Sequence, residues 1–189
     1  MTHVDVGDFE RMYQQDPDPW SFATSAYEQR RYDLTVASLL RPRYRRGFEP
    51  GCAIGELTRR LATRCDQLVA LEPSPTALAV ARQRCAGIGN VSFVAGELPR
   101  DWPEATFDLM VLSELGYYFE VSELLQLRDD AVARLEPGGT LVAVHWRGHS
   151  DAHRLHGDEV HAHLAKATVV RHAGSYVDDG FRLDLWERT

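Results

Sequence analysis

Residues 48–55 have the sequence FEPGCAIG and are the most informative part of this 189-residue chain. A short strand ending near Glu49 leads into a loop of small residues, and a helix with Leu57 and Leu61 on one face follows. Small residues at 51, 53 and 55 let the backbone approach a ligand without Cβ clashes. In an open α/β sheet, that ligand lies beyond the carboxyl ends of the strands.

Strands and helices alternate downstream of this loop. A strand over 68–71 ends at Glu72, and Ser74 and Pro75 begin a helix that runs to about Cys85. Ser122 is the predicted N-cap of another helix, and further strands are predicted over 91–94, 107–112 and 140–145. Strands separated by helices of about 10–15 residues favour a parallel, doubly wound sheet.

The two ends of the chain differ from this alternation. Helices are predicted near residues 9–13 and over 27–40, and two strands over 168–170 and 181–186 flank a turn at 178–180. A short connection requires an antiparallel pair. We therefore predict an α/β fold with a doubly wound, mostly parallel seven-stranded sheet and an antiparallel C-terminal edge strand.

Composition and charge exclude several classes of protein. Lys and Arg number 21 against 28 Asp and Glu, giving a net charge of −7, so nucleic acid is a poor candidate for the main partner. Apolar runs are shorter than the roughly 18 residues that span a bilayer, and the acidic start does not resemble a secretory leader. Three cysteines without a CxxC pair favour a reducing, cytoplasmic location.

Three predicted strands end in groups that suit different parts of one ligand. Glu49 stands ahead of the small-residue loop, where a carboxylate would repel a pyrophosphate and attract an ammonium group. Glu72, 17 residues after Gly55, can accept hydrogen bonds from both hydroxyls of a ribose. Glu97 can accept from the exocyclic amine of adenine while the Leu98 N–H donates to a ring nitrogen.

Five segments together resemble the class I S-adenosylmethionine-dependent methyltransferases. They are residues 48–55 (FEPGCAIG), 71–74 (LEPS), 96–98 (GEL), 107–111 (FDLMV) and 135–141 (LEPGGTL). The resemblance implies a Rossmann-like methyltransferase fold with S-adenosyl-L-methionine as the cofactor. Ala53 stands where the family usually has its middle glycine, so we expect weaker or slightly displaced cofactor binding. The expected cofactor residues are Trp20, Tyr27, Arg31, Glu49, Gly51, Cys52, Ala53, Gly55, Glu72, Pro73, Glu97, Leu98 and Ser113.

A second resemblance covers nearly the whole chain. Residues 16–20 (DPDPW), 25–32 (SAYEQRRY), 114–118 (ELGYY), 145–149 (HWRGH) and 157–161 (GDEVH) are similar to the nodulation protein S family. That family N-methylates the free amine of a deacetylated chitin-type oligosaccharide. The resemblance implies one methyltransferase domain over 1–189, with an arm and lid (1–32), a cofactor-binding core (33–145) and a substrate loop, helix and hairpin (146–189). In the lid, Arg31 is expected to pair with the methionine carboxylate.

Glu114 and His145 are the expected catalytic residues because they end neighbouring strands in front of the methyl group. Glu114 can hydrogen-bond an acceptor amine or take its proton. The expected acceptor-binding residues are Tyr117, Tyr118, Trp146 and His149. His149 and His153 are four residues apart, as in some zinc sites, but methyl transfer to an amine needs no metal, so we predict none.

Three alternatives differ from an amino-sugar N-methyltransferase. A small-molecule O-methyltransferase would need a stronger base, for which His145 is the candidate. A non-catalytic S-adenosylmethionine-binding protein would bind the cofactor without turnover. A nicotinamide dehydrogenase is disfavoured because the GxGxxG fingerprint is missing. The expected partner is a small-molecule or oligosaccharide amine, with no nucleic acid and no membrane, and no oligomeric state is predicted.

Overall fold

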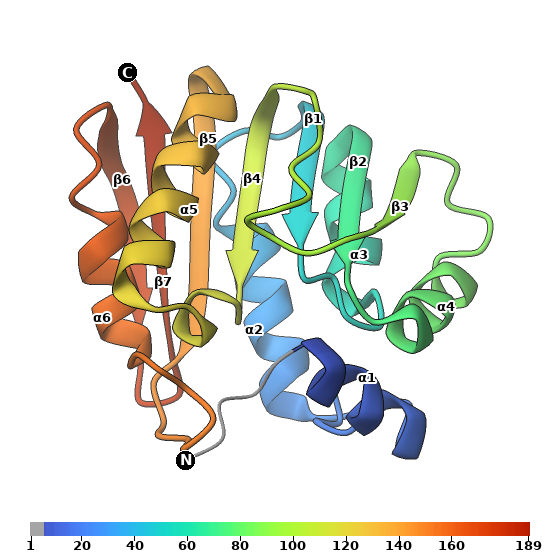
Figure 1. The fold of residues 1–189 in the computed structure, drawn as a ribbon. Coiled ribbons are helices and arrows are strands. Elements are labelled where there is room, and N and C mark those ends of the chain that lie inside the picture. The colour runs from blue at the N-terminus through green and yellow to red at the C-terminus, as the bar shows by residue number, and fades with distance from the viewer. Residues whose placement is uncertain (1–5) are drawn as a thin grey trace.

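The sheet of this protein has seven strands in the order β3-β2-β1-β4-β5-β7-β6 (Figure 1). The computed structural model describes residues 6–189. The strands are β1 (Tyr44–Pro50), β2 (Cys65–Glu72), β3 (Val91–Ala95), β4 (Phe107–Ser113), β5 (Leu135–Trp146), β6 (Val170–Val177) and β7 (Phe181–Arg188). Neighbouring strands pair in parallel from β3 through β2, β1 and β4 to β5, whereas β7 is antiparallel to both β5 and β6. The predicted fold class is confirmed.

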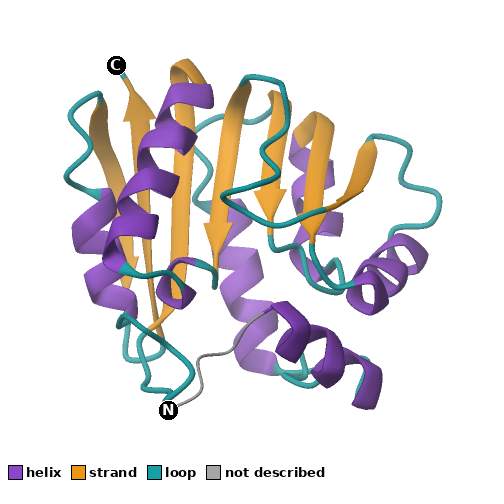
Figure 2. Cartoon of the chain, in the orientation of Figure 1, coloured by secondary structure: helices purple, strands orange, loops and turns teal. Residues whose placement is uncertain are grey.

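Helices cover both faces of the sheet (Figures 1 and 2). The α-helices are α1 (Val6–Gln15), α2 (Ala26–Ala37), α3 (Glu56–Leu61), α4 (Pro75–Arg84), α5 (Val121–Arg134) and α6 (Gly157–Leu164). Two short 3₁₀ helices, η1 (Ala62–Arg64) and η2 (Gly116–Tyr118), complete the set in the described residues. Helices α5 and α6 lie on one face, and α2, α3 and α4 lie on the other. Within residues 6–189, no helix combines the length and apolar character needed to cross a membrane.

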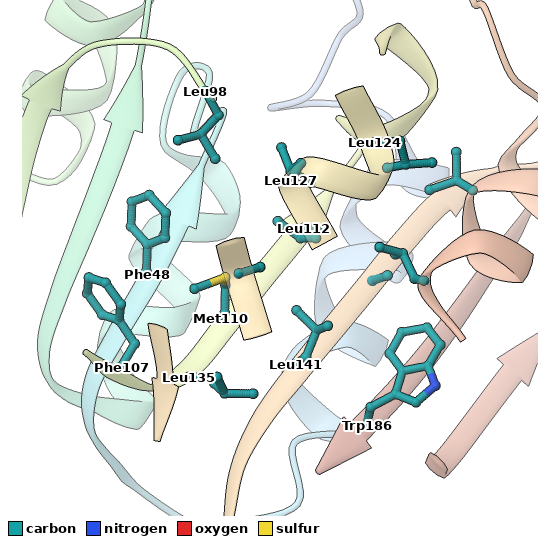
Figure 3. Packing of buried hydrophobic residues seen from close by; sticks show 14 of the residues in the cluster. Phe48, Leu98, Phe107, Met110, Leu112, Leu124, Leu127, Leu135, Leu141 and Trp186 are labelled. Atoms are coloured by element: carbon teal, nitrogen blue, oxygen red, sulfur yellow. The ribbon is translucent and has the colours of Figure 1, made fainter. Parts of the chain in front are cut away.

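The central strands are apolar on both faces because helices cover both. In β4, Met110 and Leu112 point to the layer of α5, where they pack with Leu124 and Leu127 (Figure 3). Leu109 and Val111 have the opposite parity and pack with residues of α2 and α3. Alternation along each strand therefore determines which layer a side chain enters.

Several predicted boundaries differ from the observed ones, and one of them is the end of the helix predicted over 27–40, which stops at Ala37 as α2. Helix α5 is capped by a reciprocal pair, Glu120 and Glu123, so Ser122 lies inside the helix. Strand β5 begins at Leu135 because that residue already pairs with Phe107 of β4. In the hairpin, β6 begins at residue 170 and is the outermost strand, and β7 lies between it and β5.

The Ser74 cap is confirmed, because its hydroxyl accepts a hydrogen bond from the N–H of Ala77 at 3.0 Å. The proposed end of the arm after residue 32 falls inside α2, which continues to Ala37. The carboxyl ends of β1 and β4 point to one edge of the sheet, and α1 lies beside that edge (Figure 1). The topology thus brings the N-terminal helices to the edge where a ligand is expected.

Candidate cofactor and acceptor site

A cavity of about 680 Å³ opens at this carboxyl edge. Its walls come from α1, the segment 19–28, and the loops that follow β1, β2, β4 and β5. Predicted site residues that line it are Trp20, Tyr27, Gly51, Ala53, Glu72, Pro73, Ser113, Glu114, Tyr117, Tyr118, Trp146 and His149. Predicted site residues that do not line it are Arg31, Glu49, Cys52, Gly55, Glu97, Leu98 and His145.

The loop after β1 follows an unusual backbone path. Gly51, Ala53 and Gly55 all have positive φ angles, of 71°, 49° and 81°. A Cβ at Gly55 would lie 3.1 Å from Ala81 of α4, so this glycine also permits close packing of the loop on the helix. The N–H groups of Gly51 and Cys52 both donate to the carbonyl of Leu71, at 2.7 and 3.0 Å. The loop is thereby fixed to the end of β2.

Ala53 is strained in this loop, since a left-handed conformation costs a residue with a Cβ about 1–2 kcal/mol. We predict that Ala53→Gly raises the free energy of unfolding by up to about 1 kcal/mol, because added flexibility of the unfolded chain offsets part of the relief. The variant should also bind S-adenosylhomocysteine more tightly. Calorimetry and chemical denaturation measure the two effects. Ala53→Val is the matched control and should have the opposite effects, whereas weaker binding by Ala53→Gly would contradict this account.

Glu72 is a buried hydrogen-bond acceptor at the end of β2. Its Oε2 accepts from the N–H of Ala53 and its Oε1 from the N–H of Ser74, both at 2.9 Å. Burial raises the pKa of Glu72 to about 7. Each carboxylate oxygen retains a further lone pair, and the side chain lines the cavity. The geometry fits a vicinal diol, such as that of a ribose.

Glu49 lies behind the loop and is also buried. Within residues 6–189, its Oε2 has no hydrogen-bond partner. Burial, with the nearby Glu72 adding to it, raises the pKa of Glu49 to about 8. A buried carboxyl group with an unsatisfied oxygen is suited to a cationic ligand atom. The position of Glu72 at the cavity therefore fits the ribose of S-adenosylmethionine, whereas Glu49 does not line the cavity, so its contact with the ammonium group stays a prediction.

We predict that contact between Glu49 and the ammonium group makes cofactor binding pH-dependent. Below pH 8 the Glu49 carboxyl group holds a proton, which a bound ammonium group must displace, so affinity for S-adenosylhomocysteine should rise from about pH 6 to pH 8. Calorimetry in buffers of different ionisation enthalpy should detect proton release on binding. In Glu49→Gln the release should fall, with only the contribution of Glu72 remaining. Affinity that is constant over this range in the wild type would exclude ionisation of Glu49.

Glu114 follows β4 and has a positive φ of 55°, which is rare for a residue other than glycine. Its Oε1 accepts from the N–H of Trp146 at 2.7 Å, and its Oε2 accepts from the Tyr117 hydroxyl at 2.8 Å. Arg31 Nη1 lies 3.2 Å from Oε1. Burial raises the pKa of Glu114, and the Arg31 charge opposes that rise. The carboxylate is thus held in one orientation at the cavity wall.

Arg31 is buried behind the cavity wall. Its guanidinium contacts the Glu28 and Glu114 carboxylates and donates to the Ser113 hydroxyl at 3.1 Å. Within residues 6–189, its Nε has no partner. Two carboxylates already compensate its charge, so the pairing with a methionine carboxylate stays a prediction. Its observed contacts instead connect α2 to Glu114.

His145 does not reach the cavity, and the prediction that its side chain faces the acceptor is wrong in this structure. His145 lies on the same face of β5 as Leu141 and Ala143, so its ring enters the layer between the sheet and α6. The ring is fully buried, and its Nε2 accepts from the N–H of Gly116 at 3.0 Å. Both ring nitrogens have protein partners. Burial holds the pKa of His145 well below its usual value.

Glu97 and Leu98 lie beyond the cavity wall. The Glu97 carboxylate pairs with Arg100 at 3.3 Å, and its N–H donates to Asp101 at 2.9 Å. The Leu98 side chain packs in the core beside Phe48 (Figure 3). Their contacts to adenine stay a prediction.

Several cavity residues are not among the predicted ones. Phe9, Met12 and Tyr13 of α1 line the cavity, and their spacing of three and four residues could have indicated one helix face. His153 lines it too, with its ring stacked on that of Tyr117 at a centroid distance of 3.7 Å. His149 lies 3.4 Å from Asp151. Within residues 6–189, no three His, Cys, Asp or Glu side chains form a group that could hold a metal ion.

Helix α1 is tied to the N-terminus of α4. The Glu10 carboxylate accepts from the Ser74 hydroxyl at 2.6 Å and from the Thr76 hydroxyl and N–H at 2.7 and 3.2 Å. These hydrogen bonds lower the pKa of Glu10 to about 2. A negative charge at the start of a helix is also favourable to the helix dipole. The contact positions the aromatic face of α1 over the cavity.

The order of the strands and the cavity at the carboxyl edge of the sheet define this protein as a class I methyltransferase fold, with that cavity as its cofactor site. The chain belongs to the nodulation protein S (NodS) family, whose model matches residues 4–168. Nodulation protein S of Bradyrhizobium diazoefficiens is 35% identical over 131 residues, covering 66% of this chain and 61% of that protein. The chain thus spans about three-fifths of the length of that relative.

Other comparisons support the same class. A trans-aconitate 2-methyltransferase of Mycobacterium tuberculosis is 31% identical over 194 residues, covering 92% of this chain and 70% of that protein. A crystal structure from Pseudomonas syringae, assigned to the methyltransferases, has a TM-score of 0.77 and 44% identity over 87% of this chain and 100% of its own. The N-methyltransferase NodS of Bradyrhizobium japonicum, in complex with S-adenosylhomocysteine, has a TM-score of 0.83 at 22% identity over 98% of this chain and 99% of its own. That last similarity concerns the fold alone.

Proposed function

We propose that this chain transfers the methyl group of S-adenosylmethionine to the amine of an acceptor bound in the cavity. The observation that carries the proposal is the charge of the cavity wall. Glu28, Glu72 and Glu114 line it, and among the described residues no lysine or arginine does. Arg31, behind the wall, offsets one of the two charges of Glu28 and Glu114, so the wall keeps a net negative charge, which favours a cationic or amine ligand over an acceptor that is itself a carboxylate.

The finer proposal is that the acceptor is an amino sugar or a deacetylated chitooligosaccharide. Trp20, Tyr118 and Trp146 present aromatic surfaces at the cavity, which suit the apolar faces of sugar rings. Membership of the nodulation protein S family supports the same choice. Three unpaired cysteine thiols support the expected cytoplasmic location, which stays a prediction.

In this proposal, Glu114 is the residue that acts on the acceptor. When bound, S-adenosylmethionine supplies an electrophilic methyl group, and the lone pair of the amine forms the new bond as the bond from that methyl to sulfur breaks. The Glu114 carboxylate accepts a hydrogen bond from the amine and takes the proton that the nitrogen must lose. Trp146 N–H, Tyr117 and Arg31 hold the carboxylate in place while it does so. Orientation supplies most of the remaining effect.

A second candidate is methylation of a carboxylate, which the similarity to a trans-aconitate 2-methyltransferase favours. An acceptor panel separates the two. Methyl incorporation should be measured with glucosamine, its N-acetyl derivative and trans-aconitate, each with the same cofactor. The proposal expects turnover with the free amine alone. Faster turnover with trans-aconitate would favour the second candidate.

The N-terminal segment is expected to close over the bound cofactor. Trp20, Tyr27 and the α1 residue Tyr13 form part of the cavity wall, so a ligand that fills the cavity adds contacts to them. We predict that hydrogen exchange over residues 15–32 slows when S-adenosylhomocysteine binds. Mass spectrometry measures the exchange, with the distant β6 as an internal control. Equal exchange rates with and without the ligand would exclude a lid.

A further inference from the structure

A chain of buried hydrogen bonds runs from the loop after β4 to β7 along the face of the sheet that α6 covers. Gly116 N–H donates to His145 Nε2 at 3.0 Å, and His145 Nδ1 lies 3.0 Å from His161 Nε2. His161 Nδ1 lies 2.6 Å from Asp184 Oδ2. All three side chains are buried, and none lines the cavity. The four groups belong to η2, β5, α6 and β7.

The groups at the two ends of this chain of hydrogen bonds determine which ring nitrogen of each histidine carries the proton. A backbone N–H can only donate, so His145 Nε2 must accept, and the proton of the neutral ring is on Nδ1. His161 Nε2 must then accept from His145, which leaves the His161 proton on Nδ1 to donate to the Asp184 carboxylate. Every donor along the chain has one acceptor. The hydrogen bonds are consistent only when both rings are neutral Nδ1–H tautomers.

The surroundings keep both rings neutral. Burial lowers the pKa of His145 well below its usual value, and burial lowers the pKa of His161 against the opposing effect of Asp184. A proton added to either ring would place two donors face to face and break the chain. The ionisable groups that face these residues are Arg31 and His153 near His145, Asp158 and Arg182 near His161, and His172 and Arg182 at Asp184.

The chain of hydrogen bonds ends at Gly116, two residues from Glu114. Gly116 is packed closely, since a Cβ there would lie 2.4 Å from Val160 of α6 and 3.0 Å from His145 Nε2. Glu114 is fixed from the other side, because its N–H donates to the Val144 carbonyl at 2.9 Å and its carboxylate accepts from Trp146 N–H. Residues 144–146 of β5 thus hold both ends of the 114–116 turn.

We propose that His145, His161 and Asp184 form a positioning relay that holds the 114–116 turn and so keeps the Glu114 carboxylate aimed at the acceptor. His145 is a positioning residue because it acts through Gly116 and touches no reactant. The kinetic consequence rests on the proposed function. The tautomers of His145 and His161 do not depend on the proposed function, and they can be measured on the protein without substrate or cofactor.

Nitrogen NMR of the histidine-labelled chain tests the relay without substrate or cofactor. The relay requires that His145 and His161 both show a protonated Nδ1 and an unprotonated Nε2, and that both keep this tautomer as the pH is lowered through about 6.5, the ordinary pKa of histidine. The resonances are assigned from their loss in His145→Gln and His161→Gln. An Nε2–H tautomer at either ring, or titration near the ordinary value of about 6.5, would overturn the relay.

A matched pair of variants tests the positioning role. The amide oxygen of glutamine can replace His145 Nε2 as the acceptor for Gly116, whereas asparagine is too short and reaches only toward His161. We expect His145→Gln to keep kcat within about threefold and His145→Asn to lower it by more than about tenfold, with KM for the cofactor unchanged in both. Thermal unfolding identifies a variant that fails to fold, and in that case the NMR measurement of the tautomers tests the relay. Equal kcat in two folded variants would overturn the positioning role.

Discussion

Glu114→Gln is expected to lower the turnover rate by about 100-fold while leaving the affinity for S-adenosylhomocysteine nearly unchanged. Glutamine preserves the shape of the side chain, and its amide oxygen can still accept from Trp146 N–H. The Tyr117 hydroxyl can rotate to accept from the new amide nitrogen, so the turn should keep its structure. What the variant loses is the negative charge and the ability to take a proton.

Steady-state kinetics with an amine acceptor and calorimetry with S-adenosylhomocysteine measure the two halves of this prediction. Glu136→Gln is a suitable control, because Glu136 lies at the start of β5, at the opposite edge of the sheet from the cavity, where it pairs with Arg45. The control should match the wild type in both measurements. A Glu114→Gln variant with full turnover would show that the acceptor does not bind beside this carboxylate.

Glu72→Ala is expected to weaken S-adenosylhomocysteine binding by about 1–3 kcal/mol, which is the cost of leaving buried polar groups without a partner. The loss has two sources. The ribose hydroxyls lose their acceptor, and the N–H groups of Ala53 and Ser74 lose the carboxylate that orients the loop.

A second ligand separates these two sources. If the ribose contact matters, the variant should lose much less affinity for an analogue without the 2′ and 3′ hydroxyls than for S-adenosylhomocysteine. Calorimetry measures both ligands, with Glu136→Ala as the control variant. Unchanged affinity of Glu72→Ala for S-adenosylhomocysteine would show that Glu72 does not bind the ribose.

The sheet and the cofactor loop could be predicted because their signals are local. Alternating strands and helices determine a doubly wound sheet, and the carboxyl ends of its strands place Gly51, Ala53 and Glu72 at one edge. The positions of these residues follow from chain order. The strain at Ala53 could not be predicted in this way, because its positive φ is a property of the three-dimensional path of the loop.

The acceptor side was harder to predict because it depends on parity and on distant contacts. His145 ends a strand beside the cavity, yet its parity along β5 turns its ring toward His161 on α6. Arg31 was expected to face the cofactor, and its pairing with Glu28 and Glu114 depends on how α2 packs against β4. His153 lies in an irregular loop where no periodicity indicates its position.

Mass spectrometry of the reaction products tests the central claim, methyl transfer to a free amine, most directly. The chain is incubated with S-adenosylmethionine and either deacetylated chitooligosaccharides or the same oligosaccharides with every amine acetylated. The account predicts a mass increase of one methyl group on the oligosaccharides that carry a free amine, and none on the acetylated ones. Equal methylation of both sets, or no methylated product from the free amines, would contradict it.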